Sequence, residues 1–172
     1  MNHYGHRRWL VLYTRPRWER KTVHLLYEQS IEVFFPMLEE IHVWSDRKKV
    51  VAVPLFPGYI FVRIGSERER MKALATDGAM KYVHFGGSLA VVRDEIIENV
   101  RLAITRPRDL RVEKTQLYLG KEVRIQRGPL RGLTGTLVEY RGHTRVAITI
   151  EAIRQTISIE VPVSDLVQLT PA

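Results

Sequence analysis

The stretch Leu55–Ile64 constrains the fold more than any other part of the sequence, because it places apolar side chains on both faces of one predicted strand. Pro57-Gly58 is a chain-bending pair that leads into this strand. Side chains alternate between the two faces of a strand, so one face is aromatic and the other is aliphatic. The aromatic face holds Tyr59, Phe61 and Arg63, and the aliphatic face holds Ile60, Val62 and Ile64. Such a strand lies either in a sheet covered on both sides or in a sheet that presents its aromatic face to a partner. The sequence leaves both arrangements open.

The composition fits one medium domain or two small ones, since 172 residues with 45% hydrophobic content can form packed cores. Lys and Arg outnumber Asp and Glu by 27 to 19, which gives a formal charge of +8 and favours polyanionic partners. The chain has no cysteine, so disulfides and Cys-ligated zinc are excluded. The apolar run Trp9–Tyr13 is too short for a signal peptide or a membrane span. We therefore expect a soluble cytoplasmic protein that does not associate with a membrane.

The N-terminal part of the sequence predicts helices interspersed with hairpin-connected strands. Residues 9–13 predict a strand, and Pro16 marks the start of a helix with one apolar and one basic face. The other predicted strands are 31–35, 41–44, 50–53, 56–64, 82–85 and 89–92, and the other predicted helices begin at Ser66 and Asp94. This order predicts an α+β fold in which an antiparallel sheet is flanked by helices over residues 1–105.

The sequence changes character after this part. Residues 106–116 alternate charges around a proline with little apolar periodicity, which predicts a linker. Residues 117–172 predict only short strands joined by Gly-rich turns. A small β-barrel is the economical fold for such strands, because closure removes exposed edges.

The start of this second part resembles a known motif. The segments 120–125 and 128–138 closely resemble the KOW motif of transcription and ribosomal proteins. Gly128-Pro129 and Gly132 permit tight turns between barrel strands. Gly135 permits a strand to bend or to approach its neighbour closely.

Two more segments extend the resemblance over nearly the whole chain. Arg8-Trp9 together with 55–59, about 60 residues upstream of the KOW motif, is similar to the NusG family of transcription elongation factors. The segments 54–57 and 83–87 look more like the specialised paralogues of the RfaH and UpxY types than like the housekeeping factor. The resemblance implies an NGN-like RNA polymerase-binding domain over 1–105 and a KOW barrel domain over 117–172.

The resemblance also implies a mechanism. In such proteins the N-terminal domain lays an apolar patch on the clamp helices of RNA polymerase and suppresses pausing or termination, while the barrel recruits a ribosomal protein or a termination factor. On this sequence the polymerase-binding patch would centre on Phe56, Tyr59 and Phe61. Aromatic side chains suit this role because they give a large contact area for little lost side-chain entropy. We expect a monomer that works through these partners.

A second implied site is the basic face of the first helix, where RfaH-like relatives contact the non-template DNA strand. The candidate nucleic-acid-binding residues are Arg15, Arg17, Arg20, Lys21 and His24. Lys and Arg neutralise phosphates, and Trp18 or Tyr27 would stack a base if exposed. The alternative is an ordinary solvated helix face. The sequence departs from the RfaH pattern at 69–72, where those relatives carry a polymerase-lobe contact, and at Asp77, where a basic DNA contact is expected.

In the barrel, the loop 150–155 corresponds to the region where the family docks its translation or termination partner. Ile150 and Ile153 are the candidate partner-binding residues, and core packing is the alternative for both. RfaH-like relatives can hold this domain in a helical form. The β-branched residues of 134–150 predict a barrel here.

No catalytic or metal site is predicted, and no cofactor is expected. The pairs Glu39-Glu40 and Asp94-Glu95 are adjacent in sequence, so their carboxylates point to different sides and make poor acid–base pairs. The glycines of the KOW motif have no following helix and do not form a phosphate-binding loop. The alternative function is that of a ribosome-associated or RNA-binding KOW protein, which the basic charge suggests.

Overall fold

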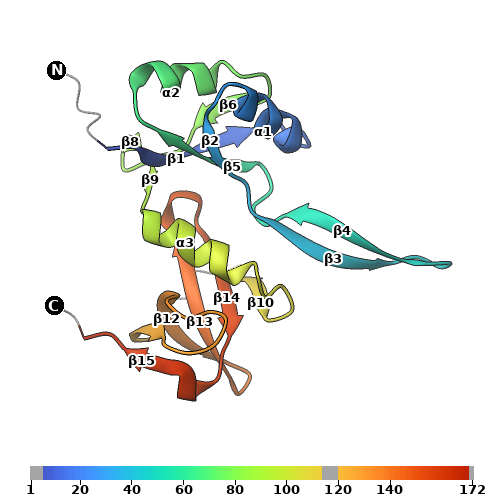
Figure 1. The fold of residues 1–172 in the computed structure, drawn as a ribbon, viewed down its shortest axis with the longest axis vertical. Helices are drawn as coiled ribbons and strands as arrows, with labels where there is room; N and C mark the ends of the chain where they lie inside the picture. The colour runs from blue at the N-terminus through green and yellow to red at the C-terminus, as the bar shows by residue number, and fades with distance from the viewer. Residues whose placement is uncertain (1–5, 114–119, 171–172) are drawn as a thin grey trace. The chain divides into compact units, whose positions relative to one another are not determined.

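The computed structural model describes residues 6–113 and 120–170 (Figure 1). These residues form two compact units. The first unit comprises Met1–Phe35 and Phe56–Asp94, and the second comprises Pro36–Leu55 and Glu95–Ala172.

The first unit is built on an antiparallel sheet. Its strands are β1 (Arg8–Thr14), β2 (Glu32–Phe34), β5 (Tyr59–Ile64), β6 (Ala79–Tyr82) and β9 (Val91–Val92). The order is β2-β5-β1-β6, and β9 also pairs with β1. The central pair runs in register from Arg8 opposite Ile64 to Tyr13 opposite Tyr59. The predicted alternation of the strand that follows Pro57-Gly58 is therefore confirmed.

One face of this sheet carries the aliphatic core. Helices α1 (Glu19–Glu28) and α2 (Glu67–Leu74) contribute Leu26 and Ala73 to it (Figure 1). The sheet contributes Leu10, Leu12, Val33, Ile60, Val62, Ile64 and Tyr82. The apolar spacing predicted for α1 is confirmed at Thr22 and Leu26, which are fully buried.

Helix α2 begins where Ser66 predicts it. The Ser66 Oγ accepts a hydrogen bond from the Glu69 N–H at 3.1 Å. The Glu69 carboxylate in turn accepts one from the Gly65 N–H at 2.8 Å. The first bond satisfies an amide that a helix start leaves without an internal partner, and the second ties the residue before the N-cap to the first turn. Glu69 belongs to the segment 69–72, where the sequence differs from the RfaH pattern. Its side chain therefore has a structural role in this fold.

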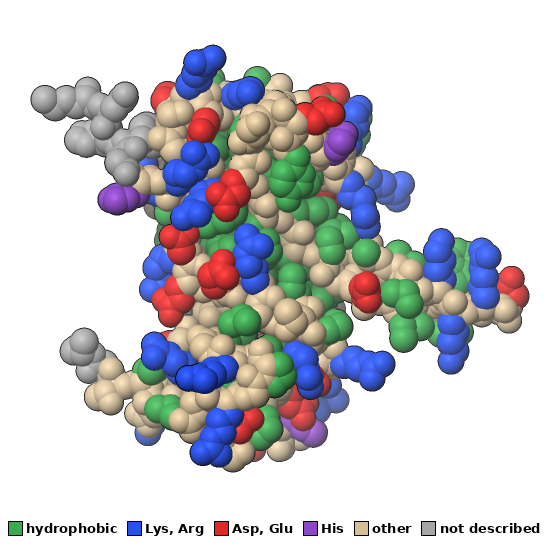
Figure 2. Space-filling view, viewed as in Figure 1, with side chains coloured by type: hydrophobic (Ala, Val, Ile, Leu, Met, Phe, Trp, Pro, Cys, Tyr) green, Lys and Arg blue, Asp and Glu red, His purple; other side chains and the backbone are tan. Residues whose placement is uncertain are grey.

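Two hairpins form separate two-stranded sheets. β3 (Met37–Val43) and β4 (Lys48–Pro54) form the predicted hairpin with a charged tip, and β7 (His84–Phe85) pairs with β8 (Ser88–Leu89) around Gly86-Gly87. The β3–β4 hairpin is exposed along most of its length, and hydrophobic and basic side chains lie next to one another on it (right in Figure 2). Its exposed apolar side chains are Ile41, Val43, Trp44 and Val50.

The second unit contains the predicted barrel. Its six-stranded antiparallel sheet has the order β10-β14-β13-β12-β11-β15. The strands are β10 (Leu110–Glu113), β11 (Glu122–Ile125), β12 (Thr134–Tyr140), β13 (His143–Ile150), β14 (Gln155–Glu160) and β15 (Leu166–Gln168). Two 3-10 turns, Glu151–Ile153 and Val163–Asp165, join the later strands.

The predicted linker is wrong over Leu110–Glu113. These residues form β10, which pairs with β14 from Leu110 opposite Ile159 to Glu113 opposite Thr156. The alternation of Leu110 and Val112 with charged residues is a strand pattern, and the nearby proline and charges masked it. Residues 114–116 of the linker and 117–119 of the barrel domain lie outside the described residues.

Helix α3 (Asp94–Ala103) is hydrogen-bonded to the barrel. Asn99 is buried and makes two hydrogen bonds to Thr134, both at 3.0 Å. Its Nδ2 donates to the Thr134 Oγ1, and its Oδ1 accepts from the Thr134 N–H. The Thr134 hydroxyl also donates to the Glu95 carboxylate at 2.8 Å. The predicted domain boundary at residue 105 assigns this helix to the N-terminal domain, whereas its residues from Glu95 onward group with the barrel.

The KOW-like glycines occupy positions that disfavour a side chain, two through backbone conformation and one through lack of space. Gly128 and Gly132 have φ values of 76° and 97°, which L-residues seldom adopt. A Cβ on Gly135 would lie 2.4 Å from the Ala147 carbonyl oxygen and 2.8 Å from Val146 Cγ1 on the neighbouring strand. The predicted close approach of strands at Gly135 is confirmed.

We predict that Gly135→Ala lowers the free energy of unfolding by about 2 kcal/mol or more, because the backbone oxygen of Ala147 has to move away. Urea unfolding followed by circular dichroism measures this change. The matched control is Gly65→Ala, whose Cβ first meets the flexible Arg7 side chain at 3.1 Å. Equal effects of the two substitutions would contradict the prediction.

Candidate macromolecule-binding site

The aromatic face of the first sheet is largely buried, which contradicts the expectation that its rings are presented to a partner. Phe56 and Phe61 are 2% and 1% exposed, while Tyr59 is half-buried. Phe61 packs at 5.9 Å from Phe34 and at 6.2 Å from Phe56, and Phe34 packs edge-on to Trp9 at 6.4 Å. Such tilted and edge-to-face pairs are favourable ring geometries. The rings therefore pack against one another, and two of the three predicted polymerase-binding residues are buried packing residues in this structure.

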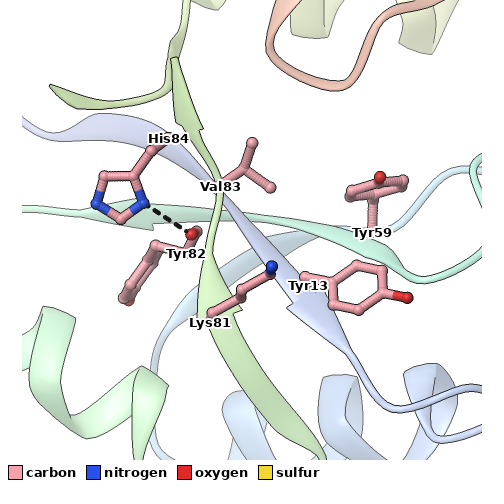
Figure 3. Close-up of a pocket in the computed structure, with 6 residues that line it drawn as sticks. All are labelled: Tyr13, Tyr59, Lys81, Tyr82, Val83 and His84. Atoms are coloured by element: carbon pink, nitrogen blue, oxygen red, sulfur yellow. Dashed lines mark hydrogen bonds between the residues drawn. The ribbon is translucent and has the colours of Figure 1, made fainter. Parts of the chain in front are cut away.

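The third residue, Tyr59, lines an open pocket of about 490 Å³ together with Tyr13, Lys81, Tyr82, Val83 and His84 (Figure 3). Tyr13 and Tyr59 are register partners on β1 and β5, and their ring centroids are 5.5 Å apart. The Lys81 ammonium lies 5.9 Å from the Tyr13 ring, because Lys81 is opposite Tyr13 on β6. The pocket thus combines two aromatic rings with an exposed cation.

The Pro57-Gly58 turn fixes the position of Tyr59 at this pocket. The Gly58 carbonyl accepts a hydrogen bond from the Thr14 N–H at 2.9 Å, and the Gly58 N–H donates to the buried Glu19 carboxylate at 3.0 Å. A Cβ on Gly58 would lie 3.1 Å from the Tyr13 ring, and φ at this residue is 84°. The positive φ favours glycine at this turn, and the close approach of the Tyr13 ring adds to that preference.

Tyr82 contributes to the pocket wall from the opposite side of β6. It shares the aliphatic core with Leu12, its register partner, and its hydroxyl donates to the Arg70 carbonyl at 2.8 Å. Burial raises the pKa of the Tyr82 phenol above its ordinary value, against the opposing effect of the Arg70 charge. The backbone oxygen of Tyr82 lies 3.1 Å from His84 Nδ1 (Figure 3). Tyr82 is thus a neutral structural residue of the pocket.

The predicted nucleic-acid-binding residues gather around the start of α1, and all five are exposed: Arg15, Arg17, Arg20, Lys21 and His24. Trp18 is the centre of this cluster, with the Lys21 ammonium 4.2 Å and the Arg15 guanidinium 5.5 Å from its ring. Arg17 has a φ of 65°, an uncommon value for a residue other than glycine. His24 pairs with Glu28 one turn further along the helix at 3.3 Å.

Asp77 lies against this basic cluster. Its carboxylate is 3.6 Å from the Lys21 ammonium and 4.0 Å from the Arg15 guanidinium. The Asp77 carbonyl accepts a hydrogen bond from the Thr22 hydroxyl at 3.1 Å, and the Gly78 carbonyl accepts one from the Arg15 N–H at 2.9 Å. The loop is therefore bonded to α1, and its carboxylate partly neutralises two of the five candidate residues.

The predicted partner-binding residues of the barrel are buried. Ile150 is on the inner side of β13 with Val146 and Ile148, and Ile153 is buried in the 3-10 turn that follows. The expectation that these side chains are presented to a partner is contradicted, because alternation along β13 directs Ile150 into the core. The exposed side chains of this loop belong to Glu151 and Arg154.

Two observations concern other classes of site. No group of three or more His, Asp or Glu side chains that could hold a metal ion occurs among residues 6–113 and 120–170. Within the same residues, no helix has both the length and the apolar character needed to cross a membrane.

Sequence reasoning missed two features. Trp9 on β1 and Phe34 on β2 join the aromatic face because both strands pair with β5, and strand pairing is not visible in local patterns. Arg111, Tyr140 and Arg141 meet in the barrel although almost 30 residues separate them in sequence. The aromatic residue beside arginine at 140–141 is a local signal for the second cluster.

Comparison with known proteins identifies similar chains. The NusG family model, described as "Transcription termination factor nusG", matches residues 7–101, which is more than half of the chain. The "Transcription termination/antitermination protein NusG" of Staphylococcus epidermidis is 29% identical over 148 residues, covering 78% of this chain and 80% of that protein.

Among solved structures, one described as "Domain interaction in Thermotoga maritima NusG" has a TM-score of 0.47 and 22% identity, covering 97% of this chain and 99% of that one. The MjSpt4:Spt5 complex in conformation A has a TM-score of 0.32 and 14% identity, covering 95% of this chain and 99% of that one.

Burial of Tyr82 generates a prediction for alkaline pH. The pKa of Tyr82 is higher in the folded state than in the unfolded state. The contribution of Tyr82 to folding stability is therefore complete below about pH 10. It is lost as the pH rises further, because only the unfolded state then releases the phenol proton. Tyr82→Phe lacks this dependence but also lacks the hydrogen bond to Arg70. We expect the wild-type protein to be more stable than Tyr82→Phe by about 1 kcal/mol at pH 8. It should lose this difference in unfolding free energy by about pH 11, as measured by urea unfolding. A constant difference between the two proteins would contradict the prediction.

The position of Asp77 generates a second prediction. Asp77→Asn removes a negative charge beside Arg15 and Lys21, so single-stranded DNA should bind about two- to fivefold more tightly at low salt. Fluorescence anisotropy with a labelled oligonucleotide measures this change. Asp46→Asn at the exposed hairpin tip makes the same change in net charge and serves as the control. If both variants gain equally, Asp77 does not act on the basic cluster.

Proposed function

The chain belongs to the NusG family of transcription termination/antitermination factors, and from this premise we propose that it binds RNA polymerase and suppresses pausing or termination. The match over residues 7–101 includes the whole aromatic face and the basic start of α1. It supports this function over that of a ribosome-associated KOW protein. NusG factors are not enzymes, and we propose no catalytic activity for this chain.

The polymerase contact that we propose is the pocket at Tyr13 and Tyr59, with Lys81 at its edge. The partner surface is the clamp helices, which the NusG resemblance implies. Tyrosines are common at the energetic centres of interfaces, since a rigid ring excludes water and a hydroxyl keeps a polar contact. Phe56 and Phe61 support the pocket from within. The Phe56 carbonyl accepts a hydrogen bond from the Tyr59 N–H at 3.2 Å, and the Phe56 ring packs on the Phe61 ring.

The basic cluster at α1 is the proposed contact to the non-template DNA strand. Arg15, Arg17, Arg20 and Lys21 supply positive charge, His24 lies on the same helix, and the half-buried Trp18 ring lies among them. Cations neutralise backbone phosphates, whereas an aromatic ring stacks on a base. Asp77 reduces the affinity of the basic cluster for DNA. In this proposal the contact to polymerase therefore contributes more than the DNA contact to recruiting the protein to the elongation complex.

The barrel is proposed to recruit a ribosomal protein or a termination factor. Since Ile150 and Ile153 are buried, the exposed Glu151 and Arg154 are the candidate contacts at that loop. A factor with these partners works where the polymerase does, so we place the protein in the cytoplasm as a monomer. A specialised role of the RfaH or UpxY type stays a prediction from the segments 54–57 and 83–87.

The central test is Tyr59→Ala in the full chain. Removing a half-buried ring at the pocket should weaken binding to a transcribing RNA polymerase by about tenfold or more and reduce the effect on pausing in parallel. Binding of the labelled chain to an assembled elongation complex measures the first effect, and pause lifetimes measure the second.

The control is Val163→Ala in the second unit, which truncates an exposed apolar side chain outside every proposed contact. It should leave polymerase binding unchanged. Wild-type affinity of the Tyr59 variant would reject the pocket as the contact, and failure of the wild-type chain to bind polymerase would reject the proposed function.

A further inference from the structure

A basic cluster on the barrel lies outside the KOW-like segments. The register of four adjacent strands brings its members to one face of the sheet: Arg111 is opposite Ser158, Arg145 is opposite Glu160, and Tyr140 is opposite His143. Together Arg111, Tyr140, Arg141, His143, Arg145 and Glu160 line a pocket of about 220 Å³. The cluster is formed entirely by β10, β12, β13 and β14 and the turn between β12 and β13.

Two of its cations have no carboxylate partner among the described residues. Arg111 and Arg141 are exposed, and their guanidinium carbons lie 5.9 Å and 5.2 Å from the Tyr140 ring. Tyr140 itself is 40% exposed. An exposed ring with two guanidinium groups offers both a stacking surface and positive charge to a ligand.

Arg145 has a different role, because its hydrogen bonds are made within the barrel. Its guanidinium donates to the Ser158 hydroxyl, the Ser158 carbonyl and the Asp109 carbonyl at 2.8 to 2.9 Å. It also pairs with Glu160 at 3.4 Å. Burial, and then the charge of Arg111, lower the pKa of Arg145. Arg111 is thus a second positive charge that acts on Arg145, while the carboxylates of Glu113, Glu160 and Asp109 act in the opposite direction.

The turn between β12 and β13 has an unusual residue. Arg141 and Gly142 have φ values of 51° and 77°, as a two-residue hairpin turn with both central residues in the left-handed region requires. Asparagine or aspartate followed by glycine is the preferred pair there, and arginine is not. A strained backbone at an exposed arginine is consistent with a functional use of its side chain.

Glu160 gives the pocket a hydrogen-bond acceptor. Its carboxylate pairs with His143 at 2.8 Å and with Arg145, yet two carboxylate oxygens can accept about four hydrogen bonds. A ribose 2′-hydroxyl is a donor that such a group can accept, and deoxyribose lacks it.

We propose that this face of the barrel binds single-stranded RNA. Arg111 and Arg141 contact the phosphates, a base stacks on Tyr140, and Glu160 accepts a hydrogen bond from a 2′-hydroxyl. None of its residues belongs to the first unit, which carries the proposed polymerase contact. It also differs from RNA binding by the KOW-like turn, since all of its residues lie outside 120–138.

The test uses the full chain with a fluorescein-labelled oligouridylate, measured by anisotropy at several salt concentrations. Arg141→Asn should weaken binding about tenfold and reduce the salt slope by about one, because a phosphate contact is lost. The hairpin should remain folded, as asparagine suits this turn. Tyr140→Leu should also lose about tenfold, whereas Tyr140→Phe keeps the ring and should bind nearly as wild type.

Arg127→Asn, at the exposed KOW-like turn, makes the same change in net charge and is the matched control. Ultraviolet cross-linking followed by mass spectrometry should place the RNA on Tyr140, which separates this site from the basic start of α1. An equal loss for Arg127→Asn and Arg141→Asn, or no cross-link at Tyr140, overturns the proposal. Equal affinity for the oligodeoxyuridylate overturns the assignment to RNA, and displacement by an acidic peptide at equal concentration overturns the assignment to nucleic acid.

Discussion

The pairing of β1 with β5 is the constraint on which the first unit depends. Both strands are apolar on both faces, and six consecutive register pairs hold them together. One face of the pair receives α1 and α2. The other places Trp9, Val11 and Phe61 in the sheet centre and Tyr13 beside Tyr59 at its end. Because a shift of one residue would exchange the two faces, this register determines both the core and the composition of the pocket.

Local patterns predicted the elements well, because alternation and caps are properties of neighbouring residues. The strand after Pro57-Gly58, the helix capped by Ser66 and the glycines of the barrel follow such rules. Burial depends on what lies opposite, so the sequence could not separate an exposed aromatic face from a packed one. Phe56, Phe61, Ile150 and Ile153 illustrate this limit, since all four are buried. Strand β10 was missed for a related reason, as its pairing with β14 spans almost 50 residues.

The positive charge of the chain is unevenly neutralised. Around Trp18, the carboxylate of Asp77 lies within 4.0 Å of two cations, and the loop that carries it is bonded to α1. Around Tyr140, Glu160 is engaged with His143 and Arg145, which leaves Arg111 and Arg141 with ring contacts alone among the described residues. A formal charge of +8 therefore does not locate a polyanion site. The distribution of carboxylates around each aromatic residue is more informative.

The burial of Arg145 explains why the barrel can hold so much charge at one face. A buried guanidinium is costly unless its donors are satisfied, and here the hydroxyl and carbonyl of Ser158, the Asp109 carbonyl and Glu160 satisfy them. These bonds connect β13 to β14 and to the residue that precedes β10. The same arginine that joins the strands adds positive charge at this face but uses most of its donors within the barrel. Arg111 and Arg141, at the rim, are consequently the side chains through which the positive charge of this face can act on a polyanion.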